Sequence, residues 1–130
     1  MRDQRWWTWH VAAGVVILVL LGLHMTIMHL NAIVGAFNAP GTEPIDWANV
    51  AARGRSVFFL VTYVLLLGAA LFHGLYGLRN ILFELNPAGG VKKALNLLLV
   101  VGGLALFLFG TWAAWGSFQV AGATSGTAAL

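Results

Sequence analysis

Three long apolar segments constrain the fold of this chain more than any other feature of its sequence. They cover residues 11–37, 57–82 and 94–115, and each reaches the about 20 residues that a helix needs to cross a bilayer. Hydrocarbon offers the backbone no hydrogen-bonding partner, so segments of this length without strand-type alternation are expected to be helical. We therefore predict an all-α integral membrane protein with three transmembrane helices in a single domain, residues 1–130.

The composition excludes several classes of function. Hydrophobic residues make up 60% of the chain and charged residues 8%, against about 45–50% and about 25% in soluble domains, so there is no room for a separate catalytic domain. The basic residues are too scattered to form a nucleic-acid-binding patch. The chain has no cysteine, so any metal must be bound by histidine or carboxylate.

The turns and the charges predict an orientation. Pro, Gly and Asn interrupt the apolar pattern at residues 38–41 and 86–90, and the second break is short enough to make its flanking helices antiparallel neighbours. Three spans place the N-terminus and this second break on one side of the membrane. That side holds Arg2, Arg5, Arg79, Lys92 and Lys93, whereas the other holds only Arg53 and Arg55. The positive-inside rule then predicts a multi-pass protein of the cell's inner (cytoplasmic) membrane with a cytoplasmic N-terminus. We expect the tail from Ala121 to be loose.

Histidines within the spans are the main candidates for function, because polar groups in hydrocarbon are costly and usually functional. At about 1.5 Å per residue, His24 and His29 lie about 20 and 27 Å into the first span, and His73 lies about 14 Å from the cytoplasmic end of the second. Imidazole suits haem iron, so we predict His73 as a haem ligand, together with His24 or His29. These two differ by about 140° around the helix, so they cannot bind the same haem. The alternative for each is an interhelical hydrogen bond.

Neighbouring residues extend this hypothesis. Gly77 shares a helix face with His73 and leaves space for a flat ring, and Arg79 lies near the membrane border, where it can pair with a haem propionate. Glu84, just past the cytoplasmic end of the second span, is a weaker candidate for passing protons to a quinone. The alternatives are a border arginine and a solvated border charge. His10, beside three tryptophans, is interpreted as a membrane-border residue rather than a ligand.

Glycines on the first and third spans indicate close helix contact. They are Gly14, Gly22, Gly102, Gly103 and Gly110.

The segment His-Gly-Leu-Tyr-Gly-Leu-Arg-Asn-Ile-Leu-Phe-Glu, from His73 to Glu84, resembles the second helix of D-type hydrophobic membrane-anchor subunits of succinate dehydrogenase and fumarate reductase, the complex II family. The shared pattern is a haem-ligating His, a Gly four residues later and an acidic residue eleven residues later. The resemblance also covers the glycine-bearing first helix, from Gly14 to His24.

This resemblance implies a complex of a flavoprotein, an iron–sulfur subunit and two anchors that bind haem b and quinone. The chain would hold no succinate site. It would dock the catalytic subunits and help to form the sites through which electrons reach quinone, with one haem b or two shared with the partner anchor. His24 and His29 resemble the two-haem forms, whereas Leu85 departs from the family, in which many members have a quinone-contacting Tyr. Two alternatives are a cytochrome b subunit of another quinone-linked oxidoreductase and a haem-free scaffold.

Overall fold

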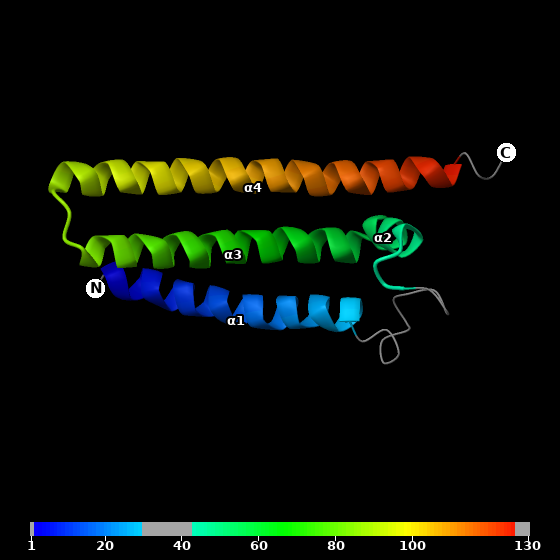
Figure 1. The fold of residues 1–130 in the computed structure, drawn as a ribbon, viewed down its shortest axis with the longest axis horizontal. Helices are drawn as coiled ribbons and strands as arrows, with labels where there is room; N and C mark the ends of the chain where they lie inside the picture. The colour runs from blue at the N-terminus through cyan, green and yellow to red at the C-terminus, as the bar shows by residue number, and fades with distance from the viewer. Residues whose placement is uncertain (1, 30–42, 127–130) are drawn as a thin grey trace.

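The structure, a computed structural model, describes residues 2–29 and 43–126, and these form four helices. They are α1 (Arg2–His29), α2 (Trp47–Gly54), α3 (Val57–Glu84) and α4 (Gly89–Gly126). The three long helices run antiparallel in a single layer, with α3 between α1 and α4, and α2 lies at the end opposite the N-terminus (Figure 1). We call the end of the bundle where the chain begins the N-terminal end, and the opposite end, where α2 lies, the α2 end.

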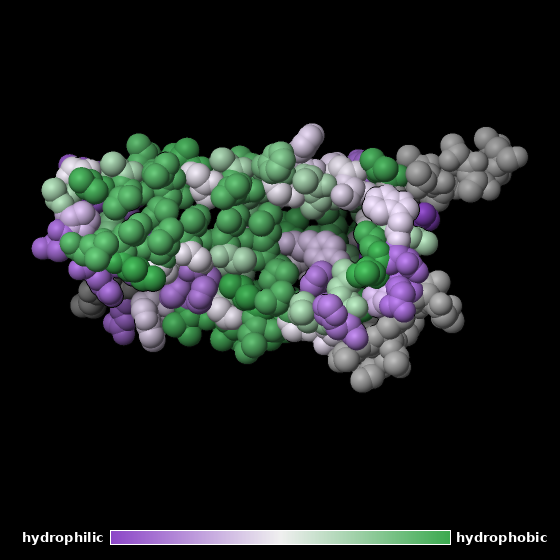
Figure 2. Space-filling model, in the orientation of Figure 1, coloured by the Kyte–Doolittle hydropathy of each residue, from purple (hydrophilic) through white to green (hydrophobic). Residues whose placement is uncertain are grey.

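The surface of this layer suits lipid. Three helical segments, Gln4–His29, Val57–Glu84 and Gly89–Val120, are long and apolar enough to cross a membrane, so the predicted all-α fold with three spans is confirmed. Among the described side chains, only Ile27 and Phe59 are buried hydrophobic ones. Hydrophobic side chains cover most of the face seen in Figure 2, as expected when lipid replaces a protein core.

The helices are longer than the sequence predicted. α1 and α4 begin at Arg2 and Gly89 instead of residues 11 and 94, and α4 continues to Gly126, so a loose tail directly from Ala121 is wrong. Nothing in these flanking stretches forces a helix to stop at the membrane border, whereas the turn after α3 has Asn86 at a φ of 48° followed by Pro87. Residues 30–37 of the first predicted span lie outside the described residues. The short helix α2 was not predicted.

Glycines let α3 and α4 pack closely. A Cβ on Gly103 would lie 2.6 Å from Leu75 Cδ1, and one on Gly110 would lie 2.5 Å from Leu67 Cδ2. By contrast, a Cβ on Gly102 would meet no atom within 4 Å. Of the predicted packing glycines on this helix, Gly103 and Gly110 therefore make the contact and Gly102 does not.

This difference between adjacent glycines is testable. Gly103→Val should lower the stability of the chain by about 1–3 kcal/mol relative to Gly102→Val, because only the first places its side chain against Leu75 of α3. Loss of helix content on titration with a denaturing detergent measures the difference. Equal stabilities would show that α4 does not pack on α3 through Gly103.

Candidate functional site

The imidazoles of His10 and His73 form a reciprocal pair where α1 faces α3. The rings stack with centroids 4.1 Å apart and planes 19° from parallel. His10 Nε2 lies 3.1 Å from the backbone oxygen of His73, and His73 Nδ1 lies 3.0 Å from the backbone oxygen of His10. Each ring therefore bonds the backbone of the other helix.

Two glycines make room for this pair. A Cβ on Gly14 would lie 3.1 Å from His73 Cε1, and one on Gly77 would lie 3.4 Å from His10 Nε2. Both helices thus carry the same pattern, a histidine followed four residues later by a glycine that accommodates the other helix's imidazole. The space that Gly77 was predicted to leave for a flat ring contains the ring of His10.

The hydrogen bonds fix which ring nitrogen of each histidine carries a proton. A carbonyl oxygen only accepts hydrogen bonds, so the proton must sit on Nδ1 of His73 and on Nε2 of His10. Nε2 of His73 makes no hydrogen bond within the described ranges. A histidine that donates from one nitrogen to a carbonyl and leaves the other free has the arrangement of a metal-ligating imidazole.

The sequence interpreted His10 as a membrane-border residue rather than a ligand. The structure places its ring at the level of His73, because the two imidazoles stack. The sequence pattern did not predict this contact, since it began the first span at residue 11 whereas α1 begins at Arg2.

His24 and His29 lie elsewhere. The ring of His24 packs edge-on against Tyr63, with centroids 5.9 Å apart, and Tyr63 is about 15 Å along α3 from His73. His29 is the exposed last residue of α1. The structure therefore brings neither of them to His73, and among the described residues no three His, Asp or Glu side chains gather as a metal site.

Arg79 lies near the C-terminus of α3, where α3 contacts α4 at the N-terminal end of the bundle. Its Nε donates to Asn96 Oδ1 at 2.7 Å and its Nη1 to Asn80 Oδ1 at 3.2 Å, while its guanidinium lies 4.3 Å from the ring centre of Phe83. Lys92 approaches the same ring at 6.0 Å. This end of the chain is therefore cationic, and Glu84 lies exposed beside it at the end of α3.

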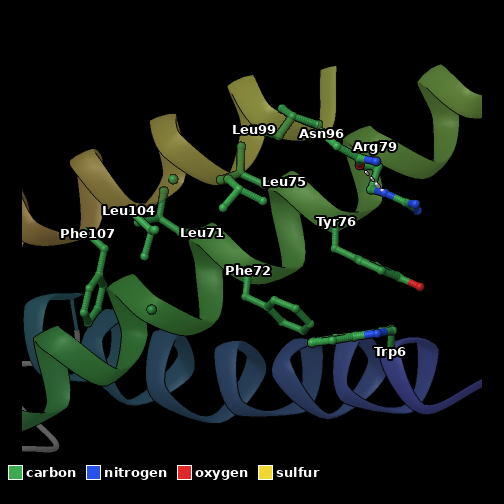
Figure 3. Close-up of a pocket in the computed structure, with 13 residues that line it drawn as sticks. Trp6, Leu71, Phe72, Leu75, Tyr76, Arg79, Asn96, Leu99, Leu104 and Phe107 are labelled. Carbon is green, nitrogen blue, oxygen red and sulfur yellow. Dashed lines mark hydrogen bonds between the residues drawn. The ribbon is translucent and has the colours of Figure 1, made fainter. Parts of the chain in front are cut away.

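A groove of about 640 Å³ runs between α3 and α4. Figure 3 shows leucines from both helices along its length and Phe107 at one end, while Arg79 and Asn96 are joined at the other. Trp6 reaches it from α1 and packs near Phe72, with ring centroids 6.4 Å apart. The sequence reading missed this groove, although its residues recur every three or four positions on both helices.

Proton placement on the two imidazoles is measurable. In the full chain reconstituted in bilayers with isotope-labelled histidine, solid-state NMR should find the His73 proton on Nδ1 and the His10 proton on Nε2. His10→Phe and His73→Phe variants assign the signals. A His73 proton on Nε2 would contradict the crossed hydrogen bonds.

The chain is similar to one curated protein, the succinate dehydrogenase hydrophobic membrane anchor subunit of Archaeoglobus fulgidus. The two are 26% identical over 106 residues, which cover 82% of this chain and 83% of the relative. No family model and no solved structure matches the chain. The similarity agrees with the three apolar helices that the structure shows.

Proposed function

We propose that this chain is a D-type membrane-anchor subunit of a succinate:quinone oxidoreductase, with His73 as an axial ligand of a haem b. The observation that carries the haem proposal is the free Nε2 of His73, on a ring held by the backbone oxygen of His10 at 3.0 Å. The curated relative supports the choice of complex, because its name is that of a succinate dehydrogenase membrane anchor.

The residues around His73 fit such a ligand. A hydrogen bond from Nδ1 to a carbonyl fixes the tautomer, orients the ring and raises the basicity of Nε2. Gly14 serves this arrangement, because a Cβ there would lie 3.1 Å from His73 Cε1, whereas a Cβ on Gly77 would make an ordinary contact with His10. When bound, haem b supplies one-electron transfer. In such a site, His73 would hold the iron through Nε2, and a partner subunit would supply any further ligand.

Two further residues belong to the proposal. Arg79 keeps Nη2 without a hydrogen bond to the described residues, which leaves a donor for a haem propionate. His24, about 21 Å along α1 from His10, whose ring stacks on His73, is the better candidate for a second haem, because it is half-buried whereas His29 is exposed.

The N-terminal end is proposed to face the cytoplasm and to dock the iron–sulfur and flavoprotein subunits. Arg5, Lys92 and Lys93 lie in the first turns of α1 and α4 at this end, in agreement with the positive-inside rule. His73, Arg79 and Glu84 lie in the half of α3 that ends there. Electrons delivered from a subunit docked at this end would therefore have a short path to His73.

The groove between α3 and α4 is proposed to take the isoprenoid tail of the quinone. Its walls are mainly leucine and phenylalanine, whereas its N-terminal end carries Tyr76, Arg79 and Asn96, which can donate hydrogen bonds. Glu84, on the same end of α3, is the proposed proton relay. A quinone has the matching chemistry, a polar ring joined to a long apolar tail.

The haem proposal predicts the effect of removing the ligand. In the complex purified with its partner subunits, His73→Phe should abolish the reduced-minus-oxidised b-type absorption of one haem. His10→Phe is the matched control and should retain it, because the backbone oxygen that orients His73 remains. His73→Met, which keeps an axial ligand atom, should retain haem at a higher reduction potential. An assembled His73→Phe complex with unchanged haem content would refute the proposal.

The groove predicts a separate effect on quinone kinetics. Leu99→Trp fills the groove and should raise the KM for a quinone with a long isoprenoid tail by about tenfold, or ~1.4 kcal/mol. Leu98→Trp is the control, since Leu98 is 67% exposed and is not part of the groove. Succinate-dependent reduction of a water-soluble dye should be unchanged in both variants. Equal KM values in the two variants would exclude the groove as the tail site.

A further inference from the structure

The short helix α2 has its polar side turned inward and its apolar side turned outward. At about 100° per residue, Trp47 and the half-buried Ala51 lie on one side and Asn49 and Arg53 on the other, with Val50 between Trp47 and Arg53 around the helix. Asn49 and Arg53 are 4% and 3% exposed, whereas Trp47 is 79% exposed and Val50 38%. This is the reverse of what burial against a protein core produces in water.

The inward polar face contacts the end of α1 and the two residues Glu43 and Pro44. Arg53 Nη2 donates to the backbone oxygen of Pro44 and contacts Met28 Sδ at 3.6 Å, near the end of α1. Asn49 Nδ2 donates to the backbone oxygen of Glu43 at 2.7 Å. These bonds fix which side of α2 points away from the chain.

The position and direction of α2 identify what meets its outer face. In Figure 1, α2 lies across the end of the bundle opposite the N-terminus, and α3 begins two residues after α2 ends. A helix lying across membrane-spanning helices lies roughly in the membrane plane. Its level is that of the first turn of α3, where the exposed apolar residues Val57 and Phe58 begin. That level is the membrane border, and Trp is enriched there.

We propose that α2 is an interfacial helix whose outer face, defined by Ile45, Trp47, Val50 and Ala51, enters the boundary between lipid headgroups and acyl chains. Ile45, just before the helix, is 74% exposed and extends this face. Glu43, Asp46 and Arg55 are exposed and meet water or headgroups. An amphipathic helix of this kind is held in the interface by its apolar face, about 5–10 Å below the headgroup surface. The occupant is therefore lipid, and through the contact of Arg53 with Met28 the helix is held against the end of α1.

Nitroxide labels test this proposal, since the chain has no native cysteine. Val50→Cys labels the outer face, and Ala52→Cys, on the same helix but outside that face, is the matched control. In the full chain reconstituted in phosphatidylcholine and phosphatidylglycerol vesicles, the ratio of oxygen to water-soluble nickel-complex collisions should be about threefold or more higher at position 50 than at position 52. Ala51→Cys repeats the measurement without removing a large side chain.

Two results would overturn the proposal. Equal collision ratios at positions 50 and 52 would place the outer face in water, and exclusion of both oxygen and the nickel complex from position 50 would mean that protein covers it. In the assembled complex, a photo-crosslinking amino acid in place of Trp47 should form adducts with lipid. An adduct with another subunit would assign this face to a protein partner instead.

Discussion

The crossed pair of hydrogen bonds between His10 and His73 is the contact on which the site in this chain depends. Gly14 makes the close approach of α1 and α3 possible, because a Cβ there would lie 3.1 Å from His73 Cε1, and each imidazole reaches the backbone of the other helix. In a bilayer, polar side chains between helices are costly unless bonded. Here each ring makes a hydrogen bond to the backbone of the other helix. Because the proton of His73 is on Nδ1, its Nε2 has a lone pair that can bind a metal.

Helix α3 contacts both of the other long helices, α1 and α4. One side of α3 packs its histidine against α1, and another forms the groove with α4, where Gly103 and Gly110 set the helix separation. Arg79 closes the groove at the N-terminal end through its 2.7 Å hydrogen bond to Asn96. A single layer with α3 in the middle thus brings the proposed ligand, the groove and the cationic end together on one helix, and it leaves the outer faces open to lipid and partner subunits (Figure 1).

The sequence predicted the all-α class and the three spans, because apolar runs of this length leave little choice in a bilayer. It did not predict the contact between His10 and His73, because hydropathy marks apolar runs but does not say how two helices are offset along each other. It missed α2 because these eight residues, which include three alanines and an arginine, form no long apolar run.

The central claim is that His73 binds haem iron through Nε2 while Nδ1 donates to the backbone of α1. A density map of the complex assembled with its partner subunits tests it most directly. The account predicts iron about 2 Å from Nε2, as for other metal-bound imidazoles, with the His10 backbone oxygen still at hydrogen-bonding distance from Nδ1. A map in which the His73 ring meets only protein or lipid would contradict it.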